Sequence, residues 1–274
     1  MAKKLSALTR LREGVTFDEY RAIEAVNWSS LKVMAESPAH YKWSLDHDRK
    51  ATSAMGKGIA IHAAVLEPDS FPLRFVVWDG DRRGNAWKEF REANANRDVI
   101  TRAEYDLCIS VRDAVKADAD ASALLYGRSE LVIEWEDEGT GLMCKARLDH
   151  VNADNEIVDL KMCPNTDVFQ FERHSASMLY HGQLAFYRRG LAAVLKAVVP
   201  RPRIIAVEWD EPHDVTAFHL TDDALYAGEQ HVDDLLTRLA NCRRSDKWPG
   251  RYQGQQDLSI PEYLMLQAEP DGAW

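Results

Sequence analysis

The chain has 274 residues, 46% of them hydrophobic, and a formal net charge of −10. This length supports one large domain or two small ones around a substantial core. No run approaches the roughly 18 apolar residues of a membrane span, and the start of the chain lacks the apolar region of a signal peptide, so we expect a cytoplasmic protein. The four cysteines lie far apart without a C-x-x-C pair, which argues against a zinc knuckle and against disulfides.

The excess of acidic residues lies near the C-terminus. Residues 205–274 contain 14 Asp or Glu and 5 Lys or Arg, so residues 1–204 hold 30 acids and 29 bases. A nearly neutral body can carry a basic groove for nucleic acid, whereas the acidic end is expected to face solvent, a partner or the outside of an assembly. A merely solubilising acidic surface is an equally good interpretation of that end.

The beginning of the chain predicts an arm followed by short helices. Residues 1–26 are charged and weakly periodic, which indicates a loosely held arm or a short helix. Ser29 or Ser30 can then cap a helix that Ser37-Pro38 ends, and a second short helix follows.

His62 is the residue of the next helix that can bind a metal or titrate. Residues 59–66 are mostly apolar, and Pro68 ends the helix. A lone histidine on an apolar helix is more often a hydrogen-bonded core residue, so both interpretations stay open here. Gly56 and Gly58, which precede the helix, do not match either glycine-rich phosphate-binding pattern.

The middle of the chain predicts a loop, a helix and a strand. Residues 79–100 are polar, basic in places and broken by glycines, which indicates a mobile loop over a groove or simply a solvated loop. Residues 101–125 predict a helix, and residues 129–136 alternate apolar and polar side chains as a strand does. Glu130 begins that strand on its polar side. It is a candidate carboxylate ligand, although a solvated strand end is the common alternative.

A predicted β-hairpin carries the most informative residues of the chain. Its strands cover residues 142–151 and 156–162, and a turn rich in Asn and Asp joins them. Asp149 lies near the end of the first strand. Because side chains alternate along a strand, Asp159 and Lys161 lie on one side of the second strand, about 6 to 7 Å apart. Two carboxylates beside a lysine can form a site for a hard cation, although a solvated hairpin face is the common alternative.

A long helix predicted over residues 176–197 follows the hairpin. Gln183 and Tyr187 lie on one face of it, together with Tyr180 and Leu184, and we expect this face to cover the hairpin. Arg188 lies on another face, from which it can steer nucleic acid.

Two more strands, a helix and a tail complete the predicted order. Residues 204–209 and 215–219 predict strands, and residues 221–243 predict an acidic amphipathic helix capped by Thr221. From residue 247 a tail rich in Pro and Gly is expected to wrap the body.

Five motifs, in this order, resemble those of the PD-(D/E)xK nuclease superfamily, and in particular its exonuclease VIII (RecE-type) and RecB-like branches. They are GKGIAIH at residues 56–62, SE at 129–130, CKARLDHV at 144–151, IVDLK at 157–161 and YHGQLAFY at 180–187. The resemblance implies an α/β protein with a restriction-endonuclease-like core, in which helices flank a central mixed β-sheet. That nuclease domain would cover residues 27–243, between an N-terminal arm (residues 1–26) and a C-terminal tail (residues 244–274) packed on the domain.

The resemblance also implies a metal site. Asp149 and Asp159 would be the two metal-binding aspartates, with the backbone carbonyl of Leu160 as a further ligand. Glu130 matches an acidic ligand of the exonuclease branch, and His62 matches a histidine near the metal. The expected metal is Mg²⁺, for which Mn²⁺ can substitute. Clustered C-terminal cysteines are missing, so no iron–sulfur cluster is expected.

Further residues would complete the catalytic and DNA-binding set. Lys161 would be the motif lysine, which orients or helps deprotonate water, or balances charge on the phosphate. Gln183 and Tyr187 match the supporting Q-x-x-x-Y motif. Leu148 stands where the superfamily name has proline. The candidate DNA contacts are Ser29, Ser30, Arg82, Arg83, Lys88 and Arg188.

The activity implied by the resemblance is Mg²⁺-dependent digestion of double-stranded DNA from its ends, 5′ to 3′. It would leave 3′ single-stranded overhangs for phage-type recombination by single-strand annealing. A ring-like homo-oligomer and a single-strand annealing protein as partner are implied as well. Two alternatives remain: a structure-specific endonuclease of the same fold, and a noncatalytic DNA-binding module.

Overall fold

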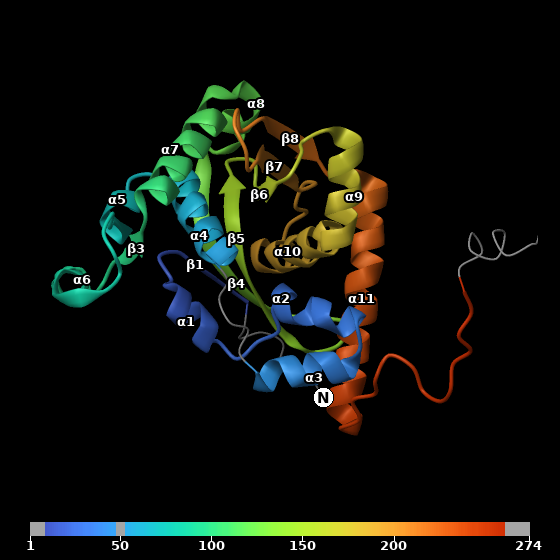
Figure 1. Cartoon of the computed structure of the whole chain (residues 1–274). Helices are drawn as coiled ribbons and strands as arrows, with labels where there is room; N and C mark the ends of the chain where they lie inside the picture. Colours follow the sequence, from blue (N-terminus) through green and yellow to red (C-terminus); the bar gives the residue numbers. More distant parts are fainter. Residues whose placement is uncertain (1–8, 48–52, 261–274) are drawn as a thin grey trace, which may run out of the picture.

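A mixed β-sheet lies at the centre of the molecule (Figure 1), whose computed structural model describes residues 9–47 and 53–260. Within these residues the sheet has the strand order β1-β4-β5-β6-β7-β8, and all neighbours are antiparallel except the parallel pair β6 and β7. The predicted α/β class, with a central mixed sheet flanked by helices, is confirmed. The strands are β1 (Arg10–Arg12), β4 (Gly127–Glu136), β5 (Met143–Asn152), β6 (Ile157–Cys163), β7 (Arg203–Glu208) and β8 (Val215–His219).

The predicted hairpin is formed by β5 and β6. Asn152 builds its turn, because its side-chain oxygen accepts hydrogen bonds from the backbone N–H groups of Asp154 (3.0 Å) and Glu156 (2.9 Å). Asn155 adopts a left-handed conformation with φ 60°, which asparagine tolerates better than most residues. The Asn- and Asp-rich sequence therefore turns the chain where it was predicted to do so.

Alternating side chains of β6 divide the interior into two cores. Ile157 and Cys163 belong to one core, which also contains side chains of α10 (Tyr180–Leu195) and α11 (Asp222–Ser245). Val158 and Leu160 belong to the other core, which contains side chains of α4 (Ser53–Leu66) and α7 (Arg102–Ala117). In Figure 1 these two pairs of helices lie on opposite sides of the sheet. The sheet is thus covered on both faces, as an α/β fold requires.

Shorter helices surround this central part. The helices α1 (Phe17–Ala22), α2 (Trp28–Leu31) and α3 (Pro38–Asp46) lie in the N-terminal region, with a 3₁₀ turn at Lys32–Ala35 between the last two. A projecting helix, α6 (Gly84–Ala93), lies at the left of Figure 1, in the segment that joins the small parallel pair of strands β2 (Phe75–Val77) and β3 (Asp98–Ile100). The remaining helices are α5 (Phe71–Arg74), α8 (Ala119–Leu124) and α9 (Val168–Met178).

Two glycines allow helices to approach their neighbours closely. A Cβ atom at Gly190 of α10 would lie 2.5 Å from the ring of Trp135 on β4, and one at Gly228 of α11 would lie 2.3 Å from the backbone oxygen of His181. Neither contact leaves room for a methyl group. α10 is therefore held between the sheet and α11 by positions that only glycine fits.

Several predicted boundaries in the first half were wrong. The cap of α2 is Asn27, whose side chain accepts the N–H of Ser30 at 2.9 Å, and neither Ser29 nor Ser30 caps the helix. The predicted loop over residues 79–100 contains α6 and β3. The predicted helix over residues 101–125 is two helices, because Asp118 ends α7 and caps α8.

The predicted long helix after the hairpin is also broken in two. Leu179 adopts a left-handed conformation with φ 60°, so α9 ends there and α10 begins. The helix was predicted to begin at residue 176, whereas α9 already begins at Val168.

The ends of the described chain differ in how they pack. The predicted N-terminal arm is tied to the sheet, since β1 pairs with β4 at its edge. In the tail, the ring of Trp248 stacks on Tyr41 at 6.0 Å, and the carbonyl of Pro249 accepts the N–H of Ala39. Residues 252–260 are exposed, and residues 261–274 of the predicted tail lie outside the described residues. The division into arm, domain and tail stays a prediction.

Among the described residues, none of the helices has the length and apolar character needed to cross a bilayer. All four cysteines are free thiols and buried.

Candidate metal and active site

Three carboxylates lie in one row across neighbouring strands. Pairing of β4 with β5 aligns residue 129 with His150 and residue 131 with Leu148, which puts Glu130 opposite Asp149. Pairing of His150 with Val158 puts Asp149 opposite Asp159 on β6. The register of the sheet therefore gathers residues that lie far apart in the sequence.

The strands β5 and β6 separate at this row. Their ladder pairs are His150 with Val158 and Val151 with Ile157, next to the turn. Beyond them, the backbone N–H of Leu160 donates to the carboxylate of Asp149 at 3.0 Å. A side chain thus takes the place of a backbone partner where the two strands separate, beside the carboxylate row.

Glu130 has an unusual backbone conformation for a residue within a strand. Its φ of 56° lies in the left-handed region, which is costly for a residue with a Cβ atom. The conformation interrupts the ladder at this residue, since the flanking residues on both sides pair with β5. Non-glycine residues in this conformation often occur at functional sites, where the surrounding structure holds them.

Each carboxylate of the row has a basic partner. His62 of α4 lies with its Nδ1 atom 3.4 Å from Asp149, and the Nζ atom of Lys161 lies 2.5 Å from Asp159. Glu130 forms an ion pair with Arg147. His62 therefore makes more than the core contact of an ordinary buried histidine, although its role as a direct metal ligand stays a prediction.

Burial and neighbouring charges separate the pKa values of the carboxyl groups. Burial alone would raise the pKa of Asp149, but His62, Lys161 and the N–H of Leu160 outweigh burial and lower it to about 2. Burial raises the pKa of Asp159 to about 6 against the opposing charge of Lys161. Burial and the charge of Asp149 raise the pKa of Glu130 to about 7. Strong and opposite shifts within one cleft are typical of functional sites.

The pKa values of the neighbouring basic groups, Lys161 and His62, are raised. Burial favours the neutral form of Lys161, but Asp159 and Asp149 outweigh it and raise the pKa of the ammonium group. The same balance of burial against Asp149 raises the pKa of His62. Both shifts favour the positively charged forms of these side chains beside the row.

The row opens into a cavity of about 580 Å³. Six of the residues predicted for the site or for DNA binding line it: Ser29, His62, Glu130, Asp149, Lys161 and Tyr187. Asp159 lies beneath, with 1% of its surface exposed, in contact with Lys161. The structure thus brings together residues from α2, α4, α10 and three strands.

Gln183 and Tyr187 support the cavity from α10. The amide of Gln183 donates a hydrogen bond to the Tyr187 hydroxyl at 3.0 Å, one helical turn apart. Burial, followed by the charge of Asp159, raises the pKa of Tyr187 well above its usual value. The predicted pair is therefore adjacent to the site, with a neutral phenol facing the cavity.

Sequence reasoning missed several residues of the cavity wall. Phe17 and Tyr20 come from α1, Glu67 and Arg74 lie at the ends of α4 and α5, and Arg147 lies on β5. Arg147 could have been found, because it shares a strand face with Asp149 two residues away. The position of α1 depends on contacts that are distant in sequence and leave no local pattern.

Five of the six predicted DNA contacts lie away from the cavity wall. Ser30 donates its hydroxyl hydrogen to the backbone oxygen of Asn27 at 3.0 Å and lines a different cavity. Arg82, Arg83 and Lys88 belong to the exposed projection around α6. Their contact with DNA stays a prediction.

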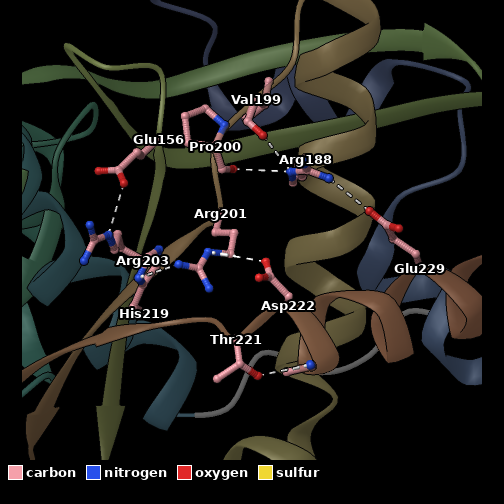
Figure 2. A network of polar contacts seen from close by, with 11 residues as sticks. Glu156, Arg188, Val199, Pro200, Arg201, Arg203, His219, Thr221, Asp222 and Glu229 are labelled. Atoms are coloured by element: carbon pink, nitrogen blue, oxygen red, sulfur yellow. Dashed lines mark hydrogen bonds and ion pairs between the residues drawn. The ribbon is translucent and has the colours of Figure 1, made fainter.

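Arg188 belongs to a polar network on the far side of α10 (Figure 2). Its guanidinium donates to the backbone oxygens of Val199 (2.8 Å) and Pro200 (3.3 Å), and to Glu229 of α11 at 3.0 Å. These bonds join α10, the loop before β7 and α11. Arg188 is therefore engaged in holding these elements together, and its contact with DNA stays a prediction.

The donors of the row fit a hard divalent cation. Within residues 9–47 and 53–260, no group of three or more His, Cys, Asp or Glu side chains is placed to hold a metal ion. Mg²⁺ can bind with fewer protein ligands, since it uses one or two carboxylates and keeps several waters. Apart from the Lys161 ammonium group, neither buried oxygen of Asp159 has a hydrogen-bond partner among the described residues. Asp149 and Asp159 are thus suited to hold Mg²⁺ at the open side of the row.

Comparison with known proteins places the chain in a family. The family model for a PDDEXK-like domain of unknown function (DUF3799) matches residues 27–258. A solved structure described as "Putative exonuclease", from Eubacterium rectale, shares the fold with a TM-score of 0.62 at 14% sequence identity. The match covers 94% of this chain and 99% of that chain. No curated protein matches the sequence. On the strength of its sequence match, its sheet topology and its carboxylate row, the chain belongs to the family of PDDEXK-like domains described as DUF3799.

Proposed function

We propose that the protein is a Mg²⁺-dependent deoxyribonuclease that digests double-stranded DNA from its ends. The observation that carries this proposal is the row of Glu130, Asp149 and Asp159 where β5 and β6 separate, with Lys161 beside it. Hydrolysis of a phosphodiester needs compensation of negative charge on the phosphoryl group and an activated water. The row and its lysine are suited to both needs.

Each residue has a part that follows from its position. Asp149 and Asp159 would hold the cation, and a cation there would supply Lewis-acid stabilisation of a phosphoryl oxygen and would lower the pKa of a water molecule. Lys161 places a positive charge between Asp159 and the cavity, where it can stabilise charge that develops on the phosphate. His62 orients the Asp149 carboxylate from the side of α4.

Digestion from DNA ends, rather than internal cutting, is supported by two similarities. The motifs of the sequence resemble those of the RecE-type branch of the superfamily, and a structure of similar fold is described as "Putative exonuclease". From the same resemblance we expect 5′ to 3′ polarity, a ring-like homo-oligomer, and cooperation with a single-strand annealing protein in phage-type recombination.

The test is digestion of linear duplexes labelled at the 5′ or the 3′ end, with and without a 5′-phosphate, beside covalently closed circular DNA. We expect release of mononucleotides from 5′ ends in Mg²⁺, no release in EDTA, and intact circles. Cut circles would instead identify an endonuclease. Metal-independent binding without hydrolysis would identify a DNA-binding module and contradict the proposal.

A further inference from the structure

The helix α1 forms one wall of the cavity without contributing to either core. Phe17 and Tyr20 line the cavity, while none of the residues of α1 is buried. The Phe17 side chain is 50% exposed, with its ring 6.5 Å from that of Tyr20. An exposed aromatic residue by itself is common on protein surfaces. Whether the Phe17 ring has a function therefore depends on how α1 is held in place.

Both ends of α1 are fixed by specific contacts. At its start, Thr16 and Glu19 form a capping box, with the Thr16 N–H donating to the Glu19 carboxylate at 2.8 Å. At its end, the Nζ atom of Lys145 donates to the backbone oxygens of Tyr20 (2.8 Å) and Ile23 (2.7 Å). Such a short helix is not stable alone, so these contacts determine its place.

Lys145 is an unusual anchor because it is buried. Only 3% of its surface is exposed, and its ammonium group also lies 4.6 Å from the ring centre of Tyr20. It projects from β5 on the same face as Arg147 and Asp149. The strand that supplies the metal-binding aspartate therefore also supplies the side chain that fixes α1 at the cavity.

Arg147 connects Phe17 to the carboxylate row. Its guanidinium lies 5.9 Å from the ring centre of Phe17 and forms an ion pair with Glu130. One side chain thus separates the exposed ring from the place where the phosphate would be cleaved. A nucleotide with its phosphate at the row can present its base to this wall.

We propose that Phe17 is a substrate-positioning residue, whose ring stacks on the unpaired base next to the phosphate held at the carboxylate row, and that Lys145 holds α1 for this contact. The inference rests on the proposed nuclease function. Unpaired bases stack on aromatic side chains, and this stacking tolerates any sequence because every base has a flat face. An enzyme that digests ends must hold such bases in turn without selecting among them.

The experiment compares linear duplexes whose terminal nucleotides carry bases with duplexes whose terminal nucleotides are abasic. For Phe17→Ala we expect KM on base-bearing ends to rise about ten- to hundredfold, with kcat nearly unchanged. On abasic ends the variant should match the wild type, because no base is present to stack. Phe17→Trp should restore the preference for base-bearing ends.

Two further variants separate this role from a general effect on folding. Phe169→Ala removes a ring that is 66% exposed on α9, away from the cavity, and should leave both substrates unaffected. Lys145→Met should reduce the preference for base-bearing ends as Phe17→Ala does, with faster hydrogen exchange in residues 17–22. A merely destabilised protein would lose activity on both substrates equally.

The outcomes distinguish this inference from the proposed function. Normal digestion by the wild type, with an unchanged base preference in Phe17→Ala, would overturn the stacking role and leave the nuclease intact. Absence of metal-dependent digestion by the wild type would overturn both.

Discussion

Asp159 and Lys161 form a buried ion pair at the centre of the site. Asp159 has 1% of its surface exposed, and Lys161 is its charged neighbour at 2.5 Å. Removing one member of a buried pair leaves the other charge without a partner, which costs more stability than replacing both. The pair can therefore be tested by stability as well as by activity.

We expect Lys161→Met to lower the free energy of unfolding by about 3 kcal/mol at pH 8, and Lys161→Met with Asp159→Asn to recover most of that loss. Neither variant should digest DNA, because both lack groups of the site. Urea unfolding measures the free energies, with Lys88→Met on the exposed face of α6 as the control. A double variant no more stable than Lys161→Met would show that the two side chains are not coupled.

At Glu130 a glycine variant should be more stable than an alanine variant, whereas at an ordinary strand position glycine is the less stable of the two. Because the φ of Glu130 is 56°, glycine relieves the backbone strain that alanine keeps. We expect Glu130→Gly to be more stable than Glu130→Ala by about 1 kcal/mol. At Glu136, at the exposed end of the same strand, Glu136→Gly should instead be less stable than Glu136→Ala. Equal stabilities at Glu130 would argue against the left-handed conformation.

Residues of the hairpin were predictable because their information is local. The alternation of side chains and the Asn-rich turn identified Asp149, Asp159 and Lys161 together with the strands that carry them. The row also includes Glu130, and its assembly needed the register of β4, which a sequence does not specify. The cavity wall of α1 depends on Lys145, more than 120 residues away from its acceptors, and could not be predicted.

At the scale of elements, two helix predictions were wrong for related physical reasons. The break between α9 and α10 lies at Leu179, a residue that disfavours the left-handed conformation it adopts, so the sequence carries no stop signal there. The helix α6 was missed because Gly84 was read as part of a loop, whereas it begins the helix with φ 78°.

The contact between α10 and α11 should weaken in acid. His181 of α10 lies with its ring 6.2 Å from that of His231 of α11. Burial, followed by repulsion from His231, lowers the pKa of His181, and burial also lowers the pKa of His231. Asp234 raises and Arg238 lowers the pKa of His231 to a smaller extent. A histidine with a lowered folded-state pKa binds protons more readily when unfolded, so its contribution is complete above its ordinary pKa of about 6.5 and is lost as pH falls below it.

We therefore expect His231→Gln to reduce the fall in melting temperature between pH 7.5 and pH 5.5. The variant removes one of the two groups that must stay neutral in the folded state. His47→Gln, at an exposed position of the chain, should keep the fall seen in the wild type. A variant His231→Gln with an unchanged pH dependence would contradict the assignment.

At the scale of the whole molecule, the site joins the two cores. His62 reaches the row from α4 on one side of the sheet, whereas Tyr187 and Gln183 approach from α10 on the other side. Both sides meet at the cavity beside the place where β5 and β6 separate, since His62 and Tyr187 both line it. The α/β class and the mixed sheet could be predicted from the resemblance of the five motifs to a known superfamily, but the meeting of residues from both sides at one cavity follows from packing.

The acidic C-terminal region remains open to a role in assembly. Residues 205–274 carry 14 acids against 5 bases, and they include α11 and the exposed residues 252–260. The carboxylate row lies on β4, β5 and β6, outside this part of the sequence. The prediction that it faces a partner or the outside of an assembly is compatible with this separation.

The most direct test of the central claim is the rate at which the protein hydrolyses linear duplex DNA in Mg²⁺, compared between the wild type and Asp149→Asn. This substitution keeps the size of the side chain and removes the charge that holds the cation. We predict metal-dependent hydrolysis by the wild type and a loss of at least about a thousandfold in the variant, since the metal-binding groups act together. An Asp149→Asn protein that digests duplex DNA at the wild-type rate would contradict the account.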